Sequence, residues 1–552
     1  MYRRQPPRRH ACNRCVQLKV KCVPVGPGAC QRCLRLGHPS SCVFPANVRG
    51  NNTPKPDSQQ PSPTNQSTAV HEEDVGPIFH EAIDTELANK LLSKYRAHKM
   101  SQFPFVIIPP EVDLATLRQQ SPFLLLCILT ASLEHDLAIQ DALEALVRKE
   151  VADRLIVNVE RNMDLLQGLL VHAAWYHYHW RTYHTHIYML LQMAIMVVVD
   201  LGLDRQESFR MQVIPIEGKE AADQARGSSA HTVAGQRALL GCYYLCSNSS
   251  IFRRQLDMRH TTWIDQCAGA LSEKAECSTD LHLKQYIEVR SLARQNQMLF
   301  DEERRGPNHA PFAIWGRAIG LVTHHQAQTK DVMSSLDTNS DWALRIELGA
   351  TATLVLGQAL RRRRDVFKLQ EMNHLGTLTA SAHYVVDTFL SVPSAAVIHL
   401  PTSTFTTIWY ALLSLSKLSL LFHPSEHQAI GVDKNTIHSK GVAIVRKFEE
   451  LSLGADVWTS SKKVVGNMLA WLDKTNNNIT AQFGPDSWQG QGTYLESQPV
   501  WPPSDSPEHV ASMDMQFQLS DELDAAVWQQ MLDSFTWVGP VTENDRDITA
   551  LP

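Results

Sequence analysis

Six cysteines lie near the start of the sequence, and their spacing is suited to binding a metal. They follow the pattern C-x2-C-x6-C-x7-C-x2-C-x8-C, at Cys12, Cys15, Cys22, Cys30, Cys33 and Cys42. The pattern contains an internal repeat, because ACNRCVQL at 11–18 is echoed by ACQRCLRL at 29–36. Thiolates are ligands of structural zinc, which takes four of them in a tetrahedron. The repeat therefore predicts two similar metal-binding halves.

The number of sulfur atoms leaves two zinc arrangements open. A single zinc would take the two C-x2-C pairs and leave Cys22 and Cys42 without a metal, as in a zinc ribbon. Two zinc ions need more ligand positions than six sulfurs supply, so two sulfurs would have to bridge. The repeat favours two metals, because it gives every cysteine an equivalent partner. Disulfides are disfavoured, since the N-terminal stretch MYRRQPPRRH has no apolar core of a secretion signal.

Basic side chains surround the cysteines. Residues 1–50 carry ten Lys and Arg and no Asp or Glu, although the whole chain has a net charge of -5. Such clustering is typical of a surface that contacts the phosphate backbone of DNA, and it argues against a mere zinc store. The opposite end is acidic, because 486–552 holds twelve Asp and Glu and one Arg. The two ends are therefore expected to have different partners.

The cysteine pattern, with Lys21 before the third cysteine and Pro24 and Pro27 in the central loop, resembles the fungal Zn2Cys6 binuclear cluster of transcription factors. The resemblance implies two Zn2+ ions bound by the six cysteines, with Cys12 and Cys30 as bridging ligands. It also implies double-stranded DNA with a CGG-type half-site as a partner, and a location in the nucleus.

The resemblance further indicates which side chains contact DNA. In the family, the lysine four residues after the second cysteine contacts bases, and here that residue is Lys19. Lysine bound to guanine O6 and N7 is among the commonest specific contacts in the major groove. Lys21, Arg14 and Arg32 are expected to contact phosphates, with solvated surface charges as the alternative.

The sequence behind the cysteines predicts a mainly α protein in four parts. A Zn2Cys6 DNA-binding domain at 1–46 is followed by a flexible linker at 47–77. An all-α regulatory domain covers 78–480, and an acidic, mostly disordered tail covers 481–552. The stretch 43–77 contains six prolines, which exclude a coiled coil. Homodimerisation would therefore have to use the helical domain.

Two segments show helical periodicity clearly. In 162–174, NMDLLQGLLVHAA, Asn162 is the expected N-cap and the apolar face comprises Leu165, Leu166, Leu169, Leu170, Ala173 and Ala174. In 187–199, IYMLLQMAIMVVV, Gly202 is the expected C-cap and the face comprises Ile187, Leu190, Leu191, Ala194, Ile195, Val198 and Val199. This apolar run of 13 residues is also too short to span a membrane.

The helical region resembles the middle homology region of the same regulators, through LLQGLLVHAAW, LLQMAIMVVVDLGLDR, RALLGCYYLCSNSS and WYALLSLSKLSLL. That resemblance implies a regulatory domain. The histidines of 172–186 lack a metal-binding motif and are expected at a turn between helices, and Cys242 and Cys246 are expected to be core thiols. The RRRR run at 361–364 fits either a nuclear-import signal or a solvated helix face. No catalytic motif is present, so we expect no enzyme with an appended zinc cluster.

One island in the acidic tail has an amphipathic pattern, SDELDAAVWQQMLDSFTW at 520–537. Acidic and apolar residues mixed in this way are typical of activation domains that bind a coactivator groove. The candidate activation residues are Leu523, Trp528, Leu532, Phe535 and Trp537. The alternative is a helix that folds back on the middle domain and restrains a repressor. The family likeness points to an activator of RNA polymerase II genes in one pathway, such as a secondary-metabolite gene cluster.

Overall fold

The computed structural model describes a large helical unit and a short part of the cysteine-rich segment. The described residues are 22, 30–35 and 83–482, except 135, 180–185, 207–231, 250–255, 257, 306–310, 358–368, 423 and 455. The chain divides into two compact units, Met1–Glu72 and Glu73–Pro552. The described part of the first unit contains the short helix α2 (Gln31–Arg35).

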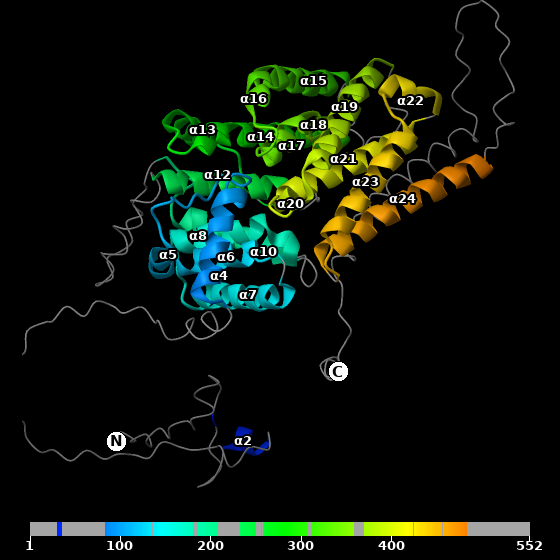
Figure 1. Cartoon of the computed structure of the whole chain (residues 1–552). Helices are drawn as coiled ribbons and strands as arrows, with labels where there is room; N and C mark the ends of the chain where they lie inside the picture. Colours follow the sequence, from blue (N-terminus) through cyan, green and yellow to red (C-terminus); the bar gives the residue numbers. More distant parts are fainter. Residues whose placement is uncertain are drawn as a thin grey trace, which may run out of the picture. The chain divides into compact units, whose positions relative to one another are not determined.

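The first half of the second unit consists of helices that turn back on one another. They are α4 (Thr85–Lys94), η2 (Tyr95–Lys99), α5 (Leu114–Gln120), α6 (Pro122–Ser132), α7 (Leu137–Glu150), η3 (Val151–Val157), α8 (Met163–Ala174), η4 (Tyr176–His179), α10 (His186–Asp200), α12 (Val233–Ser249), α13 (Thr262–Lys274), η6 (Ser278–His282) and α14 (Leu283–Arg305). Helix α8 packs against α6, α10 and α12, at the centre of the blue-to-green group in Figure 1.

The second half of this unit is also helical. Its helices are α15 (Pro311–Gln328), α16 (Lys330–Ser335), α17 (Trp342–Gly349), α18 (Thr351–Leu356), α19 (Leu369–Ser391), α20 (Ser394–Val397), α21 (Thr402–Leu421), α22 (Pro424–Ile430), α23 (Lys434–Leu451) and α24 (Val457–Gln482). Helix α19 packs against α21, and the long α23 and α24 lie side by side, yellow and orange in Figure 1. The described residues form no β-strand, and the predicted all-α fold is confirmed. None of their helices is long and apolar enough to cross a membrane.

Capping side chains explain where many of these helices begin. A side-chain oxygen before the first turn accepts a hydrogen bond from a backbone N–H in that turn at Asp84, Asp113, Asp136, Asn162, Thr261 and Asp433. Such a cap stabilises a helix by about 1 kcal/mol. The predicted cap at Asn162 is confirmed, with its Oδ1 2.9 Å from the Leu165 nitrogen. All six apolar residues predicted for this helix are buried.

The predicted end of α10 is also confirmed. Gly202 has a φ of 70°, which favours glycine. The Leu203 N–H donates to the Val198 carbonyl at 3.0 Å and the Gly202 N–H donates to the Val199 carbonyl at 3.0 Å, the two bonds of a Schellman motif. The predicted apolar face was wrong at Val199, which is 41% exposed, whereas Val197 is buried. The core contacts α10 on the side of Val197. Val199 lies two residues further, about 200° around the helix axis, and therefore projects away from the core.

Buried charges join helices that are distant in sequence. The Arg290 guanidinium of α14 lies 2.6 Å from the Glu347 carboxylate of α17, and it donates to the Asn248 side chain of α12 at 2.9 Å. Arg290 and Glu347 are both almost completely buried. Losing one partner of a buried pair typically costs about 3–5 kcal/mol, because the other charge is left uncompensated. Through Glu347 and Asn248, Arg290 therefore connects α14 to α17 and to α12.

Two neighbouring carbonyl groups between α20 and α21 accept hydrogen bonds from side chains of the first half of the helical unit. The Ile398 carbonyl accepts a hydrogen bond from the Lys99 ammonium at 3.0 Å and another from the Tyr178 hydroxyl at 2.6 Å. The next carbonyl, that of His399, accepts one from the Trp175 indole at 3.1 Å. All three donor residues are buried. Side chains from η2 to η4 thereby hold the segment between α20 and α21.

Candidate zinc and nucleic-acid interface

The described part of the cysteine segment is built around the second C-x2-C pair. Helix α2 begins directly after Cys30, whose carbonyl accepts a hydrogen bond from the Leu34 N–H at 3.0 Å. The Cys33 N–H donates to the Cys30 sulfur at 3.5 Å, and both cysteines are buried. Cys22 is partly exposed. None of these three cysteines is in a disulfide.

This arrangement fits zinc ligands. Residues three apart on a helical turn share a face, so Cys30 and Cys33 can present their sulfurs to one metal. A backbone N–H that donates to a sulfur favours the thiolate over the thiol, and thiolate is the form that binds zinc. With only sulfur donors in the array, the ligand set suits zinc better than a hard cation such as Mg2+.

The other predicted residues of this interface lie mostly outside the described residues. This is the case for Cys12, Cys15, Cys42, Arg14, Lys19 and Lys21, and for the activation residues of the tail. Arg32 is on α2. Among the described residues, no three metal-binding side chains gather into one site. The complete ligand set and the DNA contacts therefore remain predictions.

The histidines around the end of α8 belong to the core. His172, His177 and His179 are buried, and the rings of His172 and His179 stack with their centroids 5.0 Å apart. His177 Nδ1 lies 3.0 Å from the Thr402 hydroxyl. Burial lowers the pKa of His172 from 6.5 to about 3, so this imidazole is neutral. The predicted turn between helices is confirmed for His177 and His179, which lie in η4, whereas His172 lies in the last turn of α8.

The two cysteines of α12 are also core residues, as predicted. Cys242 and Cys246 are buried. A hydrogen bond with Cys242 and burial together raise the pKa of Cys246 well above its usual value, so the thiol stays protonated. A protonated, buried thiol is a poor nucleophile and a poor metal ligand. The basic run 361–364 lies outside the described residues.

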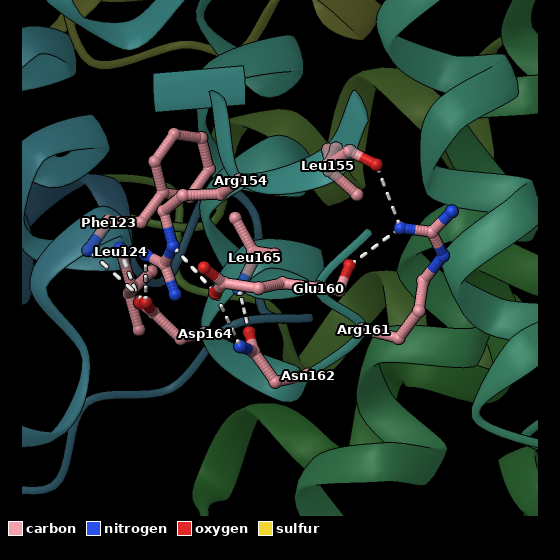
Figure 2. Close-up of polar contacts among 9 residues, drawn as sticks. All are labelled: Phe123, Leu124, Arg154, Leu155, Glu160, Arg161, Asn162, Asp164 and Leu165. Atoms are coloured by element: carbon pink, nitrogen blue, oxygen red, sulfur yellow. Dashed lines mark hydrogen bonds and ion pairs between the residues drawn. The ribbon is translucent and has the colours of Figure 1, made fainter. Parts of the chain in front are cut away.

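Sequence reasoning missed a polar network between α6 and α8, which Figure 2 shows. The Asp164 carboxylate accepts hydrogen bonds from the Phe123 N–H at 3.3 Å and the Leu124 N–H at 2.8 Å. It thereby caps α6, where Ser121 makes no side-chain cap bond. The Arg154 guanidinium donates to the same carboxylate at 2.9 Å. No local signal marks this cap, because Asp164 lies 40 residues beyond the N–H of Leu124.

Comparison with known proteins decides what the cysteine segment is. The family model described as fungal Zn(2)-Cys(6) binuclear cluster domain matches residues 10–50, which contain all six cysteines. The chain carries a fungal zinc-cluster domain. A domain of this kind binds two zinc ions, so the two-metal prediction is confirmed over the single-zinc ribbon. A second family model, described as WAR1 C-terminal domain, matches residues 59–299 of this zinc-cluster protein.

Relatives of this zinc-cluster protein are named transcription factors. Transcription factor himD of Aspergillus japonicus is 29% identical over 319 residues, 51% of this chain and 52% of himD. Transcription factor opdL of Penicillium oxalicum is 26% identical over 470 residues, 78% of this chain and 80% of opdL. Transcription factor pbcR of Emericella nidulans is 22% identical over 499 residues, 85% of this chain and 63% of pbcR.

The aligned part of this chain thus spans about half the length of himD. No solved structure matches the chain. The zinc-cluster domain and the named relatives support a DNA-binding transcription factor rather than an enzyme.

Proposed function

We propose that this zinc-cluster protein is a nuclear, sequence-specific transcription factor that activates a pathway-specific set of RNA polymerase II genes, such as a secondary-metabolite gene cluster. The observation that carries the proposal is the six-cysteine array within a segment of ten basic and no acidic residues, 1–50. Zinc supplies the folding free energy of this small segment, and the basic side chains supply its attraction to DNA. The relatives, which are named transcription factors, support the coarser part of the proposal, a role in transcription.

At the DNA, each group of residues has a distinct role in this proposal. The six cysteines hold two zinc ions, with Cys12 and Cys30 shared between them. Lys19 contacts the guanines of a CGG-type triplet, because its ammonium can bond to O6 and N7 in the major groove. Lys21, Arg14 and Arg32 contact phosphates and supply affinity without sequence preference.

The acidic tail has the second role. Its residues 520–537 bind a coactivator through one apolar face that includes Trp528 and Phe535, and the surrounding carboxylates keep the segment soluble. The second candidate function is a repressor in which this same helix folds back on the helical unit. The amphipathic face of 520–537 also fits this second function, because a helix that folds back on the helical unit needs the same apolar face as one that binds a coactivator.

Binding of the full-length protein to a CGG half-site, measured by fluorescence anisotropy, tests the proposal. We expect specific binding that a zinc chelator abolishes and added zinc restores. Cys30→Ser should lose both zinc ions and the binding, since a bridging ligand serves two metals. The matched control is Cys277→Ser in the helical unit, where serine suits the helix N-cap that this cysteine occupies. Unchanged DNA binding by Cys30→Ser would refute the zinc-dependent function.

Genome-wide mapping of the bound sites would then identify the pathway. Enrichment of CGG-type triplets upstream of one group of neighbouring genes is the expected result. Deletion of 486–552 should lower the transcription of those genes if the protein is an activator. An increase in their transcription would instead support the repressor with its intramolecular restraint.

A further inference from the structure

Residues 398–402 run from the end of α20 to the first residue of α21, and we call them the junction segment. They contain one histidine and contact a second. The side chain of His399, within the segment, is only 12% exposed. His177 of η4 is 2% exposed, and its Nδ1 lies 3.0 Å from the hydroxyl of Thr402. Two largely buried imidazoles therefore lie at this segment.

The His399 ring has neighbours on two sides. It stacks on the ring of His98 in η2, with the ring centroids 4.6 Å apart and an angle of 9° between the planes. Its Nδ1 is buried and lies 3.9 Å from the Glu134 carboxylate, too far for a hydrogen bond. No other acceptor among the described residues reaches this nitrogen. Since an imidazolium has an N–H on both ring nitrogens, these surroundings suit the neutral ring.

Glu134 is a poor counter-ion for a protonated His399, because two lysines already share its carboxylate. Lys99 Nζ lies 2.9 Å from Oε1, and Lys94 Nζ contacts Oε2. Lys99 and Glu134 are almost completely buried. The three side chains carry a net charge of +1, and a proton on His399 would place a third cation beside the single carboxylate. Like charges repel more strongly in such a buried site than in water.

Both histidines are therefore neutral in the folded chain. Burial, with Lys99 adding to the effect, lowers the pKa of His399 from 6.5 to about 3. Burial likewise lowers the pKa of His177 well below 6.5, and Lys99 and Tyr178 face that ring. The Thr402 hydroxyl can donate to Nδ1 of His177 only while that nitrogen carries no proton. The charged and titratable groups that face His399 belong to α4, η2 and the turn after α6: Lys94, His98, Lys99 and Glu134.

The junction segment can leave its place without separating an ion pair. It is held through two backbone carbonyls, which accept hydrogen bonds from the side chains of Lys99, Trp175 and Tyr178. These acceptors are neutral, and Lys99 keeps Glu134 as its partner when the segment moves away. Breaking hydrogen bonds to neutral acceptors costs less than separating a buried ion pair. The segment is therefore suited to local opening while the rest of the helical unit stays folded.

We infer that the junction segment is an acid-sensitive switch, which detaches from η2 and η4 when His399 and His177 take up protons. In the detached segment both imidazoles reach water and bind protons that the closed form excludes. The detached form therefore gains population as the pH falls below about 6.5. The inference concerns the helical unit alone and does not rest on the proposed function.

The size of the effect follows from the proton balance. A histidine with a pKa of 6.5 in the open form and about 3 in the closed form binds a proton on opening anywhere between these values. From pH 7.5 to pH 5, the equilibrium constant for opening should then increase about 30-fold for His399 alone. Proton uptake by His177 would add to this increase, because burial also keeps that ring neutral in the closed form.

Hydrogen–deuterium exchange of the full-length zinc-loaded protein, followed by mass spectrometry at pH 7.5 and pH 5, tests the inference. Labelling times are scaled for the change of the intrinsic exchange rate with pH. Two N–H groups report on the segment, those of His399 and Leu400, which donate to carbonyls of α20 at 3.0 and 3.1 Å. Their protection factors should fall about 30-fold or more at pH 5, whereas those of α23 should fall less.

The variant His399→Phe keeps a ring that can stack on His98 but cannot bind a proton. It should therefore lose about 30-fold of the pH effect, with an unchanged helical content by circular dichroism. His399→Gln makes the same test with a smaller neutral side chain if the phenyl ring disturbs the fold. The matched control is Tyr178→Phe, which removes only the hydroxyl that donates to Ile398. It should lower the protection by a similar factor at both pH values and leave the pH effect unchanged.

Three results would overturn the inference. Equal protection of the segment at pH 7.5 and pH 5 in the wild type would show that opening takes up no proton. A pH effect of full size in both His399 variants would assign the proton to a different group. Equal loss of protection throughout the helical unit at pH 5 would mean that the unit unfolds as a whole and has no local switch.

Discussion

At the scale of single residues, Lys19 and Lys21 should differ in the kind of DNA contact they make. If Lys19 contacts guanine, Lys19→Ala should weaken binding to a CGG half-site by about 1–3 kcal/mol and change binding to random DNA little. Anisotropy titrations of full-length protein on both DNAs measure this difference. Equal losses on the two DNAs would remove Lys19 from the base-contacting role and direct attention to Arg14 and Arg32.

Lys21→Ala should act differently, because a phosphate contact is independent of sequence. Binding to cognate and random DNA should weaken by a similar factor. The slope of log K against log salt concentration should decrease by about 0.9, the release of one counterion. Native mass spectrometry should still find two zinc ions, since Lys21 is not a ligand. A slope equal to that of the wild type would contradict the phosphate contact.

Buried histidine makes the helical unit sensitive to acid. The folded state keeps His172 neutral, with a pKa of about 3, whereas the unfolded chain protonates it below about pH 6.5. The unfolded state therefore binds more protons between these values, and stability must fall as the pH decreases through that window. From pH 7.5 to pH 5 the expected loss is about 2 kcal/mol for this residue. Urea denaturation of wild type and His172→Gln at both pH values measures it, and an equal pH dependence of the two proteins would refute it.

At the scale of helices, Asp164 of α8 caps the N-terminus of α6, so its replacement should lower the free energy of unfolding strongly. Asp164→Ala removes the acceptor for two backbone N–H groups and leaves Arg154 with one carboxylate fewer, so we expect a loss of about 3–5 kcal/mol. Asp164→Asn keeps an oxygen acceptor and should lose less. Asp136→Ala removes an exposed cap of α7 and should cost about 1 kcal/mol. Denaturation followed by circular dichroism ranks the three variants, and a loss for Asp164→Ala no larger than that for Asp136→Ala would contradict the role of the network.

The features that the sequence predicted correctly are those determined by residues close together in the chain. The cap at Asn162 and the glycine end of α10 depend on residues a few positions apart, and the cysteine array depends on ligand spacing. The Asp164 cap and the exposure of Val199 depend on which helix packs alongside, which periodicity does not reveal. The strained conformation of Val159, with a φ of 57°, had no sequence signal either, because valine ordinarily avoids it.

The tail segment 520–537 makes its own prediction as an element. Fused to an unrelated DNA-binding domain, 486–552 should activate a reporter gene. Trp528→Ala with Phe535→Ala should abolish that activity, whereas neutralising only the acidic residues should weaken it, since buried aromatic side chains contribute most of the energy of such interfaces. Luciferase output from matched expression levels measures both effects. A fusion that is silent although well expressed would contradict the coactivator model.

At the scale of the whole molecule, the two compact units should respond separately to loss of zinc. The metal belongs to Met1–Glu72, whereas the large hydrophobic core begins at Ile83 and lies in the other unit. A chelator should therefore abolish DNA binding and leave the thermal midpoint of the helical unit within about 1 °C. Differential scanning calorimetry with and without chelator tests this independence. A midpoint that falls by several degrees would show that the zinc domain stabilises the helical unit.

The junction at Ile398 sets an order of events during synthesis. The three side chains that hold this segment, those of Lys99, Trp175 and Tyr178, are translated more than 200 residues before its carbonyl groups exist. At about 5–20 residues per second, the ribosome needs roughly 15–60 s to proceed from Lys99 to Ile398. Throughout that interval the first helices lack part of their core, while the cysteine segment, already outside the ribosome, has everything except the metal. We therefore expect chaperones to protect mainly the helical unit of the nascent chain. The cysteine segment can acquire zinc before that unit is complete.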